Sequence, residues 1–111
     1  MKNLEIEKEF LDQLESDILH FRWLCQTAEE VSDHPHSETQ SIVLSTVLRM
    51  VEGEKIVVGE AKAVNEMTLI FPFSEKGALL LEKLQTLIRE SRDGWDRDFC
   101  FWIQLTKHYN K

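Results

Sequence analysis

The sequence predicts a single small α+β domain, mainly helical, with three to four helices and a two-stranded β-hairpin. A length of 111 residues suits one hydrophobic core, so we treat residues 1–111 as one globular domain. Hydrophobic residues make up 42% of the chain, with only four glycines and two prolines, which is typical of a folded protein. Apolar residues recur at helical spacing in three segments, and two short β-rich runs separate the second from the third.

The first segment predicts one long helix, or two helices with a bend, over roughly residues 3 to 31. No glycine or proline interrupts it. Its apolar residues recur every three or four positions, which is the spacing of one helix face. They are Leu11, Leu14, Ile18, Phe21, Cys25 and Ala28. Pro35 disfavours a helical residue before it, so a loop is expected there.

The second segment predicts a central buried helix. Ser37 and Gln40 have the spacing of a capping box, which would start the helix at this point. The residues from 42 to 51 are apolar around much of the helix circumference. Gly53 is placed to end it.

Residues 55–60 and 66–71 are short runs with β-branched residues and predict two strands, with residues 61–65 as the loop of a hairpin. A third helix is expected to open at Ser74 or Glu75 and to end at residues 93–94. Five apolar residues form its buried stripe: Leu80, Leu81, Leu84, Leu87 and Ile88.

The terminal segment, residues 95–109, fits two patterns. Phe99, Phe101, Ile103 and Leu105 alternate as in a strand, whereas Trp95, Phe99, Trp102, Ile103 and Thr106 are spaced as on a helix. We predict a helix, because Gln104, Leu105 and Lys107 are good helix formers. A strand that adds to the hairpin is the alternative.

Residues 37–73, a buried helix followed directly by two strands, resemble the helix-and-wing part of a winged-helix domain. In DNA-binding members of that family, the recognition helix and the wing carry exposed basic residues. The resemblance therefore implies an alternative function as a regulatory protein that acts by dimerisation or nucleic-acid binding. Arg49, Lys55 and Lys62 are the basic residues available for that role.

The negative charge is concentrated at the start of the chain. The first 33 residues hold nine acids and three bases, while the whole chain has a net charge of −7. Acids on a helix whose other face is apolar form either a docking surface of fixed direction, with Glu5, Asp12 and Glu15 as candidate docking residues, or only a solvated face. A pI near 5.0 opposes binding to nucleic acid or to an anionic membrane. A basic protein is the expected partner.

No catalytic, metal-binding or nucleotide-binding motif is present, so we expect no enzyme activity, cofactor or metal. His34 and His36 lack further ligands nearby and are expected in a solvated loop. Cys25 and Cys100 each lie in an apolar run and are expected to be buried free thiols. No apolar stretch is long enough to span a membrane, and acids near Met1 argue against a signal peptide. The cytoplasm is the expected location.

Four large aromatic residues fall within residues 95–102, and on a helix they cannot all point inward. Either these aromatic residues share one face and close the core, or, on a helix, Trp95 or Phe101 is exposed. Trp23 lies away from the centre of the first apolar stripe and either packs against the terminal segment or marks a contact surface. The predicted partner-binding residues are Glu5, Asp12, Glu15, Trp23, Trp95 and Phe101. Together they favour a non-enzymatic acidic protein-binding module, of the bacterial immunity or antitoxin type, that neutralises a basic partner. Homodimerisation is left open.

Overall fold

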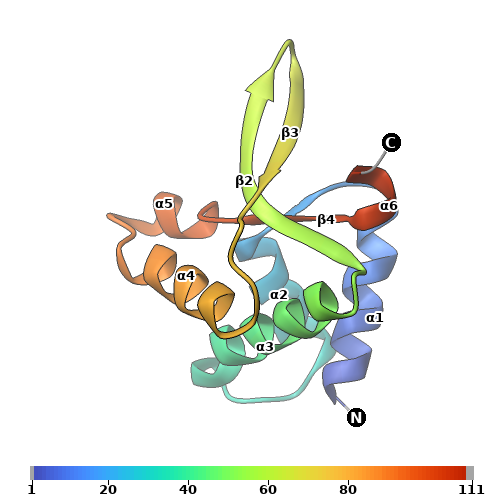
Figure 1. Ribbon diagram of the computed structural model, residues 1–111. Helices are drawn as coiled ribbons and strands as arrows, with labels where there is room; N and C mark the ends of the chain where they lie inside the picture. Colours follow the sequence, from blue (N-terminus) through green and yellow to red (C-terminus); the bar gives the residue numbers. More distant parts are fainter. Residues whose placement is uncertain (1, 110–111) are drawn as a thin grey trace.

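A computed structural model of the chain describes residues 2–109 and confirms the α+β class. Met1, Asn110 and Lys111, the ends of the predicted 1–111 domain, lie outside the described residues. In chain order the elements are α1 (Lys2–Leu14), β1 (Leu19–His20), α2 (Phe21–Val31), the 3₁₀ turn η1 (His36–Glu38), α3 (Thr39–Glu52), β2 (Ile56–Val64), β3 (Met67–Pro72), α4 (Gly77–Arg89), α5 (Gly94–Asp98), β4 (Trp102–Leu105) and α6 (Thr106–Tyr109) (Figure 1). Within this part of the chain, no helix is long and apolar enough to cross a membrane.

The sheet has four antiparallel strands in the order β1-β4-β2-β3, rather than the two strands predicted. Strand β2 has two partners: residues 56–59 pair with β4, and residues 59–64 pair with β3. Helices α1 to α4 gather below β4, and the β2–β3 hairpin projects from the opposite side (Figure 1). The long strand β2 therefore belongs to the body of the domain at its start and to a projecting arm at its end.

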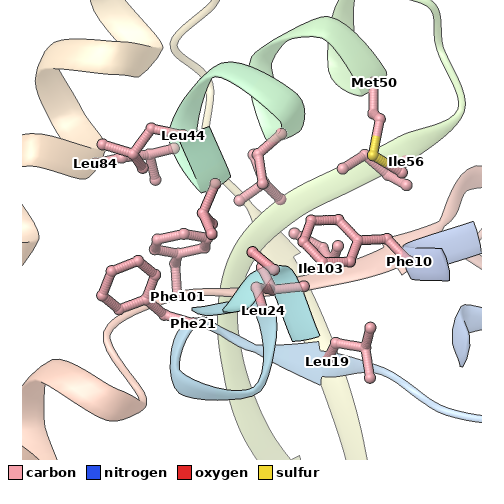
Figure 2. Close-up of a cluster of buried hydrophobic side chains, with 14 of the residues drawn as sticks. Phe10, Leu19, Phe21, Leu24, Leu44, Met50, Ile56, Leu84, Phe101 and Ile103 are labelled. Carbon is pink, nitrogen blue, oxygen red and sulfur yellow. The ribbon is translucent and has the colours of Figure 1, made fainter. Parts of the chain in front are cut away.

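The hydrophobic core lies where α1, α2, α3 and α4 meet the inner face of β4 and the first half of β2 (Figure 2). Phe10, Leu24, Met50, Phe101 and Ile103 are all wholly buried there. Four of them come from α1, α2, α3 and β4, and Phe101 directly precedes β4, so the core is closed only when the last strand is in place.

The first predicted segment is two separate helices, with a strand between them. Helix α1 ends at Leu14, and Leu19 and His20 then pair with Ile103 and Trp102 of β4. Helix α2 begins at Phe21, immediately after this short strand. Leu14, Phe21 and Ala28 of the predicted stripe are buried in the core, but at the break Leu19 takes the place predicted for Ile18. The pattern thus marked burial correctly on either side of the break, but not the break itself.

Helix α3 is central and largely buried, as predicted, and Gly53 ends it with an N–H that donates to the carbonyl oxygen of Arg49 at 3.0 Å. The predicted capping box is wrong. Residues 36–38 form the 3₁₀ turn, the helix begins at Thr39, and Glu38 at the N-cap makes no side-chain capping bond. The order of helix and then hairpin predicted for residues 37–73 is present as α3, β2 and β3.

The hairpin is longer than predicted, because most of the expected loop, residues 61–65, belongs to β2. The turn consists of Asn65 and Glu66 alone, and Val64 pairs directly with Met67. Both turn residues have positive φ, 52° and 68°, as a two-residue type I′ turn requires. Asparagine tolerates this conformation well, which favours the turn at this point.

Helix α4 buries Leu80, Leu84 and Ile88, with Leu81 and Leu87 partly buried, so the predicted stripe is confirmed. Its bounds differ from the prediction: it starts at Gly77 and ends at Arg89. Of the Asp93-Gly94 pair, expected to end it, Gly94 instead begins the short helix α5.

The terminal segment contains the strand that we gave as the alternative, and the helix prediction for it is wrong in its central part. Phe101, Ile103 and Leu105 alternate into the core, while Trp102 and Gln104 face the other side of the sheet. Strand β4 pairs on both sides, with β1 and with β2. Hydrogen bonds along both edges and burial of the alternating face outweigh the weak helix preference of Gln104 and Leu105.

Candidate functional site

An open cleft of about 740 Å³ lies between the end of α1, the start of α2 and the outer face of the sheet. We call it the aromatic cleft. It is lined by Gln13, Ser16, Asp17, Ile18, Leu19, His20, Trp23, Thr68, Phe99 and Trp102. A second hollow of about 660 Å³ holds several charged groups, but these bind one another: Arg22 to Asp98 at 3.4 Å, and His36 to Glu29. The aromatic cleft is therefore the better candidate for an external ligand.

The rings of the aromatic cleft form a continuous cluster. The ring centroid of His20 is 4.4 Å from that of Phe99 and 5.0 Å from that of Trp102, and Phe99 stacks on Trp102 at 5.8 Å. Trp95 extends the cluster outward, with its ring 4.6 Å from Phe99. Such tilted and edge-on contacts between aromatic rings are favourable and keep the rings in fixed orientations.

His20 holds two elements together at this site. It pairs with Trp102 in the ladder between β1 and β4. It is also the N-cap of α2, because its Nδ1 accepts the backbone N–H of Trp23 at 3.3 Å. The imidazole thus sets both the start of α2 and the position of the cleft's rings. Sequence reasoning missed this role of His20.

Trp23 is anchored at one end and open at the other. Its indole N–H donates to Oε1 of Gln13 at 2.8 Å, and the same oxygen accepts the hydroxyl of Thr27 at 3.2 Å. The residue is nevertheless 42% exposed. A tryptophan whose polar group is satisfied and whose ring remains accessible is the usual form of an interface anchor.

The cleft carries negative rather than positive charge. Burial lowers the pKa of His20 below its ordinary value of 6.5, and a hydrogen bond with the Asp98 backbone and the Asp98 charge oppose this only in part. The imidazole is therefore neutral at pH 7. Asp17 lines the cleft, and one of its carboxylate oxygens accepts the N–H of Ile18 at 2.8 Å. Aromatic faces beside a carboxylate suit a cationic group.

Two of the three predicted acidic residues lie on the same exposed side of α1. Glu5 and Asp12 are exposed and seven positions apart, which places them on one helix face. No ion pair involving either is found within the described residues. Glu15 lies just beyond α1 and accepts a hydrogen bond from Nζ of Lys107 at 2.7 Å, which lowers its pKa. Its charge is thus largely compensated within the protein.

Glu7 corrects the interpretation of the first segment as a uniformly exposed acidic surface. Its residue is only 7% exposed, and its two carboxylate oxygens bind Nε of Arg49 at 2.9 Å and Nζ of Lys55 at 2.6 Å. The group joins α1 to the end of α3 and to the residue that leads into β2. Glu7 lies four positions before Leu11 and seven before Leu14, so it falls on the apolar stripe of the first segment.

Replacing Glu7 with glutamine is expected to lower the free energy of unfolding at pH 7 by about 1–3 kcal/mol, because two charge-assisted hydrogen bonds are weakened. The hydrogen bond from Lys55, aided by Arg49 and opposed by burial, lowers the folded pKa of Glu7 below 4.5. The carboxylate therefore contributes stability above pH 4.5 and loses it as the pH falls through the folded pKa.

Urea unfolding at pH 7 and at progressively lower pH measures this effect. The difference between wild type and Glu7→Gln should shrink as the pH falls below 4.5. Glu5→Gln removes the same charge at an exposed position and should change stability by less than about 0.5 kcal/mol. A Glu7→Gln deficit that stays constant down to the acid limit would contradict the assignment.

The aromatic partner-binding predictions divide into two groups. Trp23 is 42% exposed and Trp95 is 73% exposed, so both are accessible to a partner. Phe101 is wholly buried, and its inclusion among the surface residues is wrong. It directly precedes strand β4 and points into the core, where its ring lies 5.1 Å from that of Phe21. Phe99 and Trp102 line the cleft instead, although they were not predicted as site residues.

The basic residues named for the winged-helix alternative are all engaged by other groups. Arg49 and Lys55 both bind Glu7. Nζ of Lys62 stands over the ring of Phe71, 5.4 Å from its centroid. A phosphate backbone would have to compete with these contacts for each cation.

The remaining candidate side chains are held in structural contacts. His36 pairs with Glu29, and Nε2 of His34 lies 3.0 Å from the hydroxyl of Thr39. Among the described residues, no group of three or more histidine, cysteine or acidic side chains could hold a metal ion. Burial raises the pKa of the Cys25 thiol to about 12 and that of Cys100 to about 11, so both are protonated and weakly reactive at neutral pH.

The chain was compared with models of protein families, with curated proteins and with solved structures. The aromatic cleft and the acids of α1 have to be interpreted from their own chemistry, since none of the three comparisons found a match.

Proposed function

We propose that this protein is a non-enzymatic, acidic protein-binding module that neutralises a basic protein partner, in the manner of bacterial immunity or antitoxin proteins. The observation that supports it is the aromatic cleft, with the accessible ring of Trp23 and the carboxylate of Asp17 in its wall. The exposed acids Glu5 and Asp12 lie on α1, whose last turn contributes Gln13 to the same cleft. The proposal places the protein in the cytoplasm, where reducing conditions keep Cys25 and Cys100 as thiols.

In this proposal, a lysine or arginine side chain of the partner enters the aromatic cleft. The cation lies against the rings of Trp23 and Trp102 and approaches the Asp17 carboxylate. Cation–π contacts contribute about 0.5–2 kcal/mol each, and more as the site is desolvated. Neutral His20 adds no repulsive charge at pH 7. The cleft would therefore supply much of the affinity, as a central anchor in an interface does.

The exposed acids act before contact. A chain with a net charge of −7 attracts a basic protein over distances of about 10 Å at 0.1 M salt, and the direction of the field favours approach to α1. Such charges raise the association rate more than the final affinity. Changes to the acids of α1 are thus expected to alter the association rate, and changes to the aromatic cleft to alter the dissociation rate.

Reversing Glu5 and Asp12 to lysine should slow association with the basic partner by about tenfold at low salt, because attraction becomes weaker. The partner is first recovered by affinity capture from the native cell with wild-type protein and identified by native mass spectrometry. Stopped-flow or surface kinetics at several salt concentrations then measure the rates. The difference in association rate between wild type and the variant should become smaller at high salt, where charges are screened.

The matched control reverses Glu82 and Glu90, which are exposed on and just after α4 and give the same change in net charge. This control should slow association less than the α1 variant does. Trp23→Ala should leave the association rate nearly unchanged and raise the dissociation rate by about 10- to 100-fold. Equal effects of the α1 and α4 reversals, together with unchanged dissociation of Trp23→Ala, would refute the proposal.

A further inference from the structure

Strand β3 forms an open edge of the sheet. In the order β1-β4-β2-β3 it has β2 on one side, and no strand of the described chain lies on its other side. The hairpin that carries it projects from the body of the domain (Figure 1). Residues 62–69 are exposed on both strands of this arm. A two-stranded ribbon that is not covered by other elements is only marginally stable in water.

The backbone of β3 offers a defined set of free hydrogen-bonding groups. The N–H of Phe73 donates to the carbonyl oxygen of Val58 at 3.0 Å, so residues 71, 69 and 67, at steps of two, also direct their backbone groups toward β2. Thr68 and Ile70 lie between them and direct theirs toward the open edge. Pro72 offers only a carbonyl oxygen there, because it has no N–H.

One face of β3 carries exposed apolar side chains, and Nζ of Lys62 of β2 stands over the ring of one of them, Phe71. Met67 is 63% exposed, Leu69 is 40% exposed and Phe71 is 45% exposed, and they share one face of the strand. No residue of β3 is charged, although the chain as a whole is strongly acidic. Natural sheet edges are usually protected by charged residues, by proline or by a covering element; β3 carries no charged residue, and its proline, Pro72, lies at the end of the strand.

We propose that β3 pairs antiparallel with β3 of a second copy of this chain, about a two-fold axis at Leu69. In this register the two Leu69 residues face each other, and Met67 lies opposite Phe71 of the second copy. Thr68 and Ile70 then form hydrogen-bonded pairs across the axis, with four N–H to carbonyl bonds. A continuous sheet of eight strands results. The apolar face of β3 in one copy then lies beside the same face of β3 in the second copy.

The neighbouring registers are poorer. Centring on Ile70 places Pro72 opposite Thr68, where the ladder needs the N–H that proline lacks. Centring on Thr68 leaves Phe71 beyond the paired segment, opposite the turn residue Asn65. Only the Leu69 register uses every outward N–H of Thr68 and Ile70 and matches apolar side chains throughout residues 67–71.

A second copy suits this edge better than a basic partner does. A basic strand would find no carboxylate along β3 and so would gain no charge complementarity there. An uncharged strand of the same length and alternation places no like charge opposite residues 67–72, and β3 itself is such a strand. The inference does not depend on the proposed function. The exposed side chains of Met67, Leu69 and Phe71 do not line the aromatic cleft. Thr68 does line it, but its side chain lies on the opposite face of β3.

Sedimentation velocity of the full chain over about 1 µM to 1 mM should show a reversible dimer, since an interface of this small size is weak. Leu69→Glu is the decisive variant. Within one chain the new carboxylate faces Lys62 of β2, which favours the hairpin. In the dimer two carboxylates meet at the axis, so the dissociation constant should rise by at least about tenfold. Leu79→Glu, at a position of α4 that is 64% exposed, is the matched control and should dimerise like wild type.

Leu69→Cys tests the register directly. Opposite residues of a non-hydrogen-bonded antiparallel pair have Cα atoms about 4.5 Å apart, which suits a disulfide. Mild oxidation at neutral pH should give a covalent dimer at least about tenfold faster than with Leu79→Cys, and the native thiols, with pKa values of about 12 and 11, should contribute little. A chain that stays monomeric up to 1 mM, or a dimer that Leu69→Glu leaves intact, overturns the proposal.

Discussion

Replacing Phe101 with alanine is expected to lower the free energy of unfolding by about 3–5 kcal/mol. The side chain is wholly buried between the helices and the inner face of β4, and its ring packs on Phe21 with centroids 5.1 Å apart (Figure 2). Alanine removes the apolar surface of the ring and leaves a cavity that surrounding groups from several elements fill only in part. Since small domains are stable by about 5–15 kcal/mol, this single change removes a large share of the total.

Urea or thermal unfolding followed by circular dichroism measures this loss. Trp95→Ala is the matched control, because it removes a larger aromatic ring from a position that is 73% exposed. It should cost less than about 1 kcal/mol, chiefly through its contact with Phe99. If the two substitutions had similar effects, strand β4 would not place Phe101 in the core.

Gly59→Ala is expected to destabilise the protein by about 3 kcal/mol, the upper end for overpacking, because the added methyl group meets backbone. A Cβ at residue 59 would lie 2.2 Å from the carbonyl oxygen of Phe71 and 2.6 Å from its carbonyl carbon. Gly59 is the residue at which β2 passes from β4 to β3, opposite Trp102 on one side and Pro72 on the other. The clash can be relieved only by moving β3 away from β2.

Gly94→Ala is the control for this change, since a Cβ at residue 94 meets no atom within 4 Å. Its effect should stay within about 1 kcal/mol in either direction. Hydrogen exchange then distinguishes a local from a global effect. In Gly59→Ala, the amides of residues 67–71 that bond to β2 should lose protection by more than those of α3. Wild-type stability and protection in Gly59→Ala would contradict the close approach of the two strands.

The sequence was sufficient to predict the α+β class, the central helix and the position of the hairpin, because local periodicity reports each of them. It was not sufficient to predict the sheet. Strand β4 gains its hydrogen bonds from β1 and β2, which are far away along the chain, and helix propensity in residues 102–105 says nothing about those partners. The same pairing interrupts the first predicted helix, because Leu19 and His20 leave helical conformation to meet β4.

In the candidate site, too, the sequence predicts the features that depend on local spacing and not those that depend on long-range pairing. Exposure of Trp95 and the acidic side of α1 were accessible from spacing alone. The aromatic cleft was not, because His20, Trp23, Phe99 and Trp102 come together only through the pairing of β1 with β4. The burial of Glu7 likewise depends on Arg49 and Lys55, more than forty residues later in the chain. Charge counting treats such an acid as part of the surface, although its partners are fixed by the tertiary fold.

The position of β4 between β1 and β2 also affects how the protein is made. During synthesis, helices α1 to α4 and the hairpin leave the ribosome before β4, the strand that joins β1 to β2. Leu19 of β1 can pair only after Ile103 has been made, 84 positions later. Until then, the nascent chain exposes the apolar side chains of Ile56 and Val58 and an unpaired strand edge. Products truncated before residue 102 should therefore remain incompletely folded, bind chaperones and be degraded rapidly.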